Sequence, residues 1–448
     1  MSMVKKVFRL AIIGAFVLSL SLLSGCSGFS ITADDFLSPP RASGEMYKIE
    51  KALKETLKTE YTLKYPTAGE YRSAYILYDL TNVGDKNFAI AFYSTTNEKN
   101  STFMNLMLMQ KVDENWLLVS DIVVNAVGVE KVDFADLNGD GIKEITIGWN
   151  VYGGMDKKVT TYALNGLKLV PIMQENYTGF ICCDLFGDGR KELFLIHHDT
   201  ITATAMAKYF SFNEDEVKAS GSCAIDGSVL SYHEPVFTKL PNGTAAIHID
   251  AVKGAGMQTE IIYCKDGTLL PAFYNPLATE NYVHPTYRNT TVASLDINGD
   301  GYLDIPLIKP ADEFTSALDQ TSLNPITIWS SYNGQTLTQT MQAIMNYTDG
   351  YYIELPKEWI GCTTVNIEIE NRLRSVCLWD TENKVIISEL VRIRAISEVN
   401  WDKPDNGFNE YVEIARHKGV VYAAMFSNYN GIEKISPEEL KSIFHIIE

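Results

Sequence analysis

The 448-residue chain has little positive charge, since 38 lysine and arginine residues face 56 aspartate and glutamate residues. The formal net charge of −18 excludes a typical nucleic-acid-binding protein, because phosphate recognition needs a basic surface. The sequence also has no apolar run of about 18 residues, which excludes an ordinary transmembrane helix. Hydrophobic residues nevertheless make up 46% of the chain, which excludes a mostly disordered protein.

The familiar sequence motifs of catalysis are missing. We find no GxSxG motif, phosphate loop or dinucleotide fingerprint, and His233-Glu234 is followed by Pro235 without a histidine at position 237. None of the seven cysteines has CxxC spacing, which argues against a zinc site or a thioredoxin-type motif. The many carboxylates still allow a hydrolase that uses two of them, so the sequence leans against an enzyme without excluding one.

The N-terminal segment has the pattern of an export signal. Three basic residues among the first nine precede the apolar segment 10–23, which is too short to span a bilayer. The following Leu-Ser-Gly-Cys sequence, which ends at Cys26, resembles the lipobox of bacterial lipoproteins. The resemblance implies cleavage after residue 25, diacylation of Cys26 and an extracytoplasmic protein anchored to a bacterial cell membrane through its lipid. The alternatives are a plain signal peptide with a chance cysteine and an uncleaved anchor.

The middle of the chain contains an internal repeat. Segments starting at Asp136, Asp184 and Asp296 match the pattern Asp-x-Asn-Gly-Asp-Gly-x-x-acid, with one departure at Phe186. The first two lie 48 residues apart and the last two 112 apart, so decayed copies are expected near residues 79 and 240. Alternating apolar residues after each loop predict strands, and later Asn-Gly and Asp-Gly pairs predict hairpin turns. Repeats of this length with several strands each indicate a propeller or a linear array.

These features resemble the FG-GAP/VCBS-type repeats of integrin-alpha-like β-propellers. The resemblance implies blades of four antiparallel strands, with the acidic loop joining the outer strand of one blade to the inner strand of the next. Two of the five units are degenerate, and five is fewer than the seven blades usual in that family. The expected fold is therefore mainly β: a β-propeller of about five recognisable four-stranded repeats and a small C-terminal α+β domain with an antiparallel sheet.

The expected boundaries follow from these patterns. We expect a lipoprotein signal peptide at 1–25, a tether at 26–42, and an N-terminal helix with a lead-in strand at 43–73. The propeller repeats should span 74–347 and the C-terminal domain 351–448, where Ser436 begins a capping box.

The acidic loops predict structural calcium sites. A calcium ion needs six to eight oxygen ligands, and glycines let the loop curl around it. The positions three beyond each final acid are apolar, which excludes EF-hands. The alternative is a solvated turn without metal. The expected donors are Asp136, Asn138, Asp140, the Ile142 carbonyl and Glu144 in the first loop; Asp184, Asp188, the Arg190 carbonyl and Glu192 in the second; and Asp296, Asn298, Asp300, the Tyr302 carbonyl and Asp304 in the third.

The sequence supports two classes of function. The first is a lipid-anchored binding or scaffold protein, whose propeller face meets a glycan or a protein. The second is an extracytoplasmic propeller hydrolase or lyase that acts on polysaccharide or peptide. The lipid anchor, the repeats and the missing catalytic motifs favour the first class, because function depends on sites and not on the fold.

Overall fold

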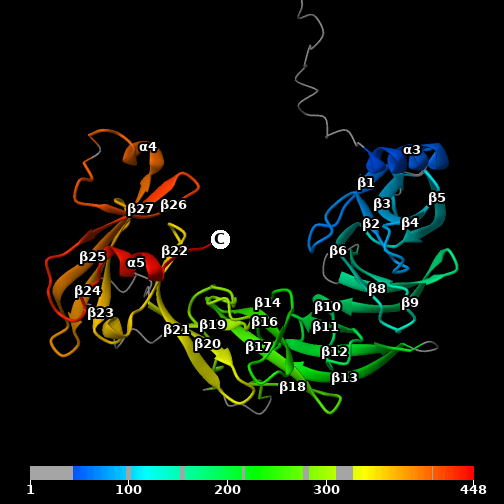
Figure 1. Ribbon diagram of the computed structural model, residues 1–448. Helices are drawn as coiled ribbons and strands as arrows, with labels where there is room; N and C mark the ends of the chain where they lie inside the picture. The colour runs from blue at the N-terminus through cyan, green and yellow to red at the C-terminus, as the bar shows by residue number, and fades with distance from the viewer. Residues whose placement is uncertain are drawn as a thin grey trace, which may run out of the picture.

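The structure is a computed structural model that describes residues 44–96, 102–151, 157–213, 217–275, 282–308, 326–405 and 407–447. The expected signal peptide, Cys26 and the tether lie outside these residues. The described residues form six antiparallel sheets that follow one another in chain order around an arc (Figure 1). The expected mainly β class is confirmed, but the arc is open between its first and last sheets and does not form a closed ring (Figure 1).

Each sheet contains four or five strands, whereas four were expected in each propeller repeat. The first sheet comprises β1 (Thr62–Lys64), β2 (Tyr75–Tyr78), β3 (Phe88–Thr96), β4 (Thr102–Val112) and β5 (Asn115–Val124). The second comprises β6 (Gly128–Ala135), β7 (Glu144–Asn150), β8 (Lys157–Asn165) and β9 (Lys168–Tyr177). The third comprises β10 (Gly179–Cys183), β11 (Glu192–Asp199), β12 (Thr204–Phe212) and β13 (Val217–Ile225).

The remaining three sheets have five strands each. The fourth comprises β14 (Ser231–Tyr232), β15 (Val236–Lys239), β16 (Ala245–Lys253), β17 (Gly256–Lys265) and β18 (Thr268–Pro271). The fifth comprises β19 (Asp304–Ile308), β20 (Ile326–Tyr332), β21 (Leu337–Asn346), β22 (Tyr351–Glu354) and β28 (Phe444–Ile446). The sixth comprises β23 (Thr363–Glu368), β24 (Leu373–Asp380), β25 (Val385–Ser397), β26 (Val412–His417) and β27 (Val420–Phe426).

The helices are short, and none among the described residues is long and apolar enough to cross a bilayer. They are α3 (Glu45–Leu57), α4 (Glu398–Trp401) and α5 (Pro437–Ile443), with a 3₁₀ turn at Lys357–Trp359.

Each acidic loop belongs to a single sheet and does not connect one sheet to the next. The loop of Asp136 joins β6 to β7, and that of Asp184 joins β10 to β11; each of these strand pairs is antiparallel and hydrogen-bonded. The loop of Asp296 is closed by an isolated bridge between Leu295 and Asp304. The expected connection from one blade to the next was therefore wrong, since each loop closes a hairpin of one sheet.

The expected hairpin turns are confirmed. Asn165 and Gly166 lie at the β8–β9 turn, where Asn165 pairs with Lys168. Asp266 and Gly267 connect β17 to β18 with φ values of 49° and 74°, the left-handed conformation that a type I′ turn requires.

Successive sheets pack face to face through apolar side chains. Phe92 of the first sheet meets Trp149 of the second with ring centroids 5.7 Å apart, and Ile90 and Ile147 lie in the same cluster. Strand residues of opposite parity point to the opposite face. In the first sheet, Ala89 and its same-face neighbours therefore pack against α3, where Ile49 and Leu53 are fully buried. Burial of each of these two side chains stabilises the fold by roughly 1.5–3 kcal/mol.

The C-terminal residues join two sheets. Residue 351, the expected start of the C-terminal domain, is the first residue of β22 in the fifth sheet, and β28 pairs with β22. The expected capping box of α5 is confirmed, because Ser436 and Glu439 exchange side-chain and backbone hydrogen bonds.

Candidate functional site

Each acidic loop is organised by its first aspartate. The carboxylate of Asp136 accepts hydrogen bonds from the backbone N–H groups of Gly139 and Gly141 at 2.7 and 3.0 Å. Asp184 and Asp296 accept the corresponding bonds in their own loops. Gly139 and Gly141 have φ values of 80° and 85°, a conformation that strongly favours glycine. The sequence pattern therefore produces a tight turn with several carboxylates close together.

The last acid of each loop is buried at the start of a strand. Glu144 is 2% exposed, and its Oε2 accepts a hydrogen bond from the backbone N–H of Leu137 at 2.8 Å. Burial, helped by the charges of Asp140 and Asp136, raises the pKa of Glu144 to about 7. Burial likewise raises the pKa of Glu192 to about 7 and raises that of Asp304. These carboxylates are electrostatically strained when they are ionised.

The loops bring the predicted donors into the same turns without forming a closed cage. Across the part of the chain that the structure describes, no three acidic, histidine or cysteine side chains are arranged to hold a metal ion. The side-chain oxygens of Asn138 and Asp140 accept hydrogen bonds from backbone N–H groups of their own loop, and the same holds for Asn298 and Asp300. The donor chemistry fits calcium, whereas the observed side-chain arrangement is that of a self-closed turn.

The second loop differs in two ways. Phe186 occupies the position of the missing donor and packs edge-on against Tyr209, with ring centroids 5.4 Å apart. The side chain of Arg190 reaches the first loop, where Nη2 donates to the Asn138 carbonyl at 3.1 Å. Its guanidinium therefore ties neighbouring sheets together, while its carbonyl is the atom that the sequence predicts as a ligand.

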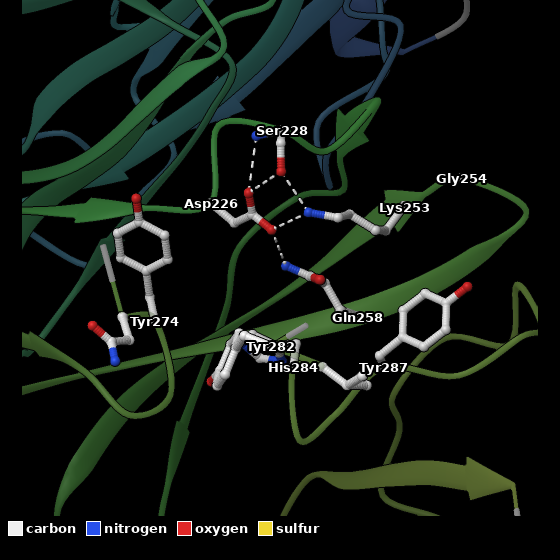
Figure 2. A pocket seen from close by; sticks show the side chains of 11 residues that line it. Asp226, Ser228, Lys253, Gly254, Gln258, Tyr274, Tyr282, His284 and Tyr287 are labelled. Atoms are coloured by element: carbon white, nitrogen blue, oxygen red, sulfur yellow. Dashed lines mark hydrogen bonds and ion pairs between the residues drawn. The ribbon is translucent and has the colours of Figure 1, made fainter. Parts of the chain in front are cut away.

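A second candidate site, which sequence reasoning missed, is a cavity of about 490 Å³ at the β16–β17 turn of the fourth sheet. Its polar lining comes from the segment after β13, from β16 and from β17, and its tyrosines come from 274 and 282–287. Figure 2 shows the polar side chains linked to one another, with Tyr274, Tyr282 and Tyr287 spread around them. Clefts of 300–1,000 Å³ with a few fixed polar groups are typical of ligand sites.

The centre of the polar lining is Asp226. Its carboxylate pairs with Lys253 and accepts hydrogen bonds from Ser228 and, at 3.0 Å, from the Gln258 amide (Figure 2). Burial acts to raise the pKa of Asp226, but the hydrogen bonds from Lys253 and Ser228 outweigh it and lower the pKa to about 2. The group is therefore a preformed and internally compensated ion pair at neutral pH.

Two unsatisfied atoms lie behind this network. The amide of Gln258 also donates to Glu260 Oε1 at 3.0 Å, while Glu260 Oε2 lies 3.8 Å from His284 Nε2. Neither Glu260 Oε2 nor His284 Nε2 has a hydrogen-bond partner, although both are buried. An unpaired buried polar atom costs about 1–3 kcal/mol, so the two atoms of this pair make the region behind the network a candidate for a functional role.

A buried ion pair supports the opposite side of β17. Arg288 Nη2 lies 2.9 Å from Asp250 Oδ1, and Thr259 Oγ1 donates to the same carboxylate at 2.6 Å. Backbone bonds between Met257 and Arg288 attach this segment to the strand edge. The segment that carries His284 and Tyr287 is thereby fixed to the fourth sheet.

A sequence signal for this site exists in β17. Gln258, Thr259 and Glu260 form a polar run in the middle of a strand whose other positions are largely apolar, and all three are buried. Buried polar residues in a central strand need partners, so such a run indicates a polar network. The partners themselves lie far away in the chain.

Comparison with known proteins assigns no family. No protein-family model matches this sequence, and no curated protein sequence matches it. A rhamnogalacturonan lyase of Bacillus licheniformis is similar in structure with 12% identity and a TM-score of 0.33, covering 82% of this chain and 73% of that chain. The exotype rhamnogalacturonan lyase YesX has 10% identity and a TM-score of 0.31, covering 74% and 84%. Likeness at this level carries no conclusion about activity.

Proposed function

We propose that the protein is a lipid-anchored extracytoplasmic binding protein that takes a polar ligand into the cavity of the fourth sheet. The observation that carries this proposal is the preformed network of Asp226, Lys253 and Gln258 beside a tyrosine-lined opening. Because these side chains already hold one another in place, a ligand would meet them at little entropic cost. Behind it, Glu260 Oε2 and His284 Nε2 are buried without a hydrogen-bond partner.

We propose further that the acidic loops hold structural calcium. The ligands in the first loop would be Asp136, Asn138, Asp140, Glu144 and the Ile142 carbonyl, with the matching residues of the third loop. The support is the donor chemistry together with the raised pKa of Glu144, since a cation would relieve the repulsion among its neighbouring carboxylates. The calcium would stiffen the hairpins, because all its ligands come from one loop.

The proposed anchor is diacylated Cys26. Its support is the lipobox at the end of a short apolar segment. Two acyl chains give stable membrane attachment, whereas one chain is marginal. The six cysteines within the described ranges are free thiols.

A second candidate function is hydrolysis or lysis of the bound ligand, on polysaccharide or peptide. Asp226 and Glu260 are connected through the Gln258 amide, and Glu260 lies 3.8 Å from His284; carboxylates with a histidine are the usual groups for acid–base chemistry. Binding remains the first proposal because the reactive atoms of Glu260 and His284 are buried. Chromatography of ligand incubated with the protein distinguishes the two, since only an enzyme yields new products.

The binding proposal is tested by plugging the cavity. Val283 lines it and is 70% exposed, so Val283→Trp should fill the opening without disturbing the core. Val83→Trp is a matched control at a 64% exposed valine near the first sheet. We would measure the melting temperature of the full-length protein in detergent with neutral oligosaccharides, oligogalacturonates and short peptides. At least one probe class should stabilise the wild type and the control but not the plugged variant. Equal responses in all three proteins, or none, would contradict a binding site here.

A further inference from the structure

Resting on this proposed binding function, we infer that the cavity of the fourth sheet recognises a neutral, hydroxyl-rich saccharide, in preference to an acidic saccharide or a peptide. Three independent features of the site point to this class: its charge, its mixture of donors and acceptors, and its tyrosines.

The charge of the site disfavours anions. Lys253 is the only lysine or arginine among the described residues that line the cavity, and Asp226 already pairs with it. A second carboxyl group, that of Glu260, lies behind Gln258 and accepts a hydrogen bond from its amide. An acidic ligand would therefore meet the Asp226 carboxylate in the lining and would have to displace it from the single ammonium group, which costs electrostatic free energy.

The polar lining of the cavity offers hydrogen-bond donors and acceptors side by side. The Asp226 carboxylate accepts, the Lys253 ammonium donates, and the Ser228 hydroxyl can do both. Neighbouring hydroxyl groups of a sugar are themselves donors and acceptors, so they can form hydrogen bonds with this polar lining without bringing charge. The mutual hydrogen bonds fix these side chains before the ligand arrives (Figure 2).

The tyrosines provide the apolar part of the match. Tyr282 and Tyr287 are 41% and 38% exposed, and Tyr274 also lines the cavity. The hydroxyl of Tyr282 donates to the Phe273 carbonyl at 2.6 Å, which orients its ring. Tyrosine gives a rigid surface that is apolar on its face and polar at its edge. A pyranose ring is similarly amphipathic, with C–H groups on its faces and hydroxyls at its rim.

The strand beside the cavity is closed to a peptide. Peptides commonly bind by adding a strand to an open sheet edge. Here, Met257 of β17 already exchanges backbone hydrogen bonds with Arg288 at 2.8 and 2.9 Å. The adjacent edge at Thr259 is occupied by the Thr286 hydroxyl, which accepts from its N–H and donates to its carbonyl. The cavity therefore lacks the backbone contacts that would favour a peptide.

The test is calorimetric titration of the full-length protein with neutral hexose and pentose oligosaccharides, with oligogalacturonates of equal length and with short basic peptides. A neutral saccharide should bind at least tenfold more tightly than the oligogalacturonates and the peptides. Tyr282→Ala should weaken this binding, whereas Tyr282→Phe, which keeps the ring, should retain it. Tyr47→Ala, at a 57% exposed tyrosine of α3, is the matched control and should have no effect.

Asp226→Asn sharpens the test because it frees Lys253 from its ion pair. The variant should bind neutral saccharide about tenfold or more weakly, since a charge-assisted hydrogen bond is lost, and should gain affinity for oligogalacturonate. Tighter binding of oligogalacturonate or peptide by the wild type, abolished by Val283→Trp, would overturn the saccharide class while leaving the binding function intact. Binding of none of the three probe classes would overturn both.

Discussion

Glu144→Gln offers a quantitative test of the calcium loops. In the folded protein, burial beside Asp136 and Asp140 raises the pKa of Glu144 from its usual 4.5 to about 7. The folded state therefore binds more protons at this group than the unfolded state between these two pH values. Without calcium, the contribution of Glu144 to stability is complete below about pH 4.5 and is lost as the pH rises through 7. Glutamine keeps the shape and an acceptor for the Leu137 N–H but does not titrate.

The size of the effect follows from the shift. A rise in pKa from 4.5 to about 7 corresponds to about 3 kcal/mol of lost stability once the group is ionised. In chelator at pH 8, Glu144→Gln should therefore be up to about 3 kcal/mol more stable than the wild type, whereas at pH 4 the two should be equal. For cooperative unfolding of a chain of this length, the difference corresponds to about 3–4 °C in melting temperature.

The assay is differential scanning calorimetry at pH 4, 6 and 8, in chelator and in millimolar calcium. Calcium should stabilise the wild type most at pH 8, where Glu144 is ionised, and should stabilise Glu144→Gln less, because one carboxylate ligand is gone. Glu70→Gln, at an exposed glutamate, is the control and should behave as the wild type. If the difference between Glu144→Gln and the wild type did not change with pH, the argument from a buried and repelled carboxylate would be refuted.

Three further predictions concern other parts of the chain. The native protein should partition into detergent, and Cys26→Ala should abolish this; recovery of the variant in the detergent phase would contradict the lipid anchor. Asp140→Ala and Asp300→Ala should reduce the calcium-dependent rise in melting temperature more than Asp188→Ala, because the second loop offers one donor fewer; equal effects in calorimetry would contradict the ranking. Asp250→Ala should destabilise the protein by about 3–5 kcal/mol in chemical denaturation, because it leaves the buried Arg288 guanidinium without its counter-charge; a cost below about 1 kcal/mol would show that this pair is dispensable.

The hairpins were predictable from sequence because their determinants are local. Glycines at 139 and 141 adopt positive φ, and Asp136 binds N–H groups three and five residues later, so one short segment contains the whole turn. The decayed copy near residue 79 has a similar hydrogen-bond pattern, since the Asp79 carboxylate accepts hydrogen bonds from the N–H groups of Val83 and Gly84. Alternation after each loop then defines which strand face is buried.

The sixth sheet and the last strand were harder to predict because their determinants are not local sequence patterns. The sixth sheet has no acidic loop, and its turns use positive φ at Arg372, Lys384 and Lys418, residues that carry no turn signal in the sequence. Strand β28 has only three residues, and its partner β22 lies about 90 positions earlier. Pairing over such a separation depends on tertiary packing and leaves no local pattern.

The cavity likewise depends on contacts between residues that are not neighbours in the chain. Lys253 and Asp226 are 27 residues apart. Glu260 lies in β17 and His284 in an irregular segment, and the two approach each other because Arg288 of that segment bonds to the backbone of Met257 in β17. The sequence shows the polar run in β17 but does not show which side chains form hydrogen bonds with it. The fold class was therefore accessible from repeats and turns, whereas the candidate binding site required the coordinates.

Hydrogen exchange tests the central claim, that the cavity of the fourth sheet is the binding site, most directly. The full-length protein would be compared with and without a saturating neutral oligosaccharide, in the wild type and in Val283→Trp. The account predicts slower exchange at 253–258 and 284–288 in the wild type, and no change in the plugged variant. Protection confined to other sheets, or protection that persists in Val283→Trp, would contradict it.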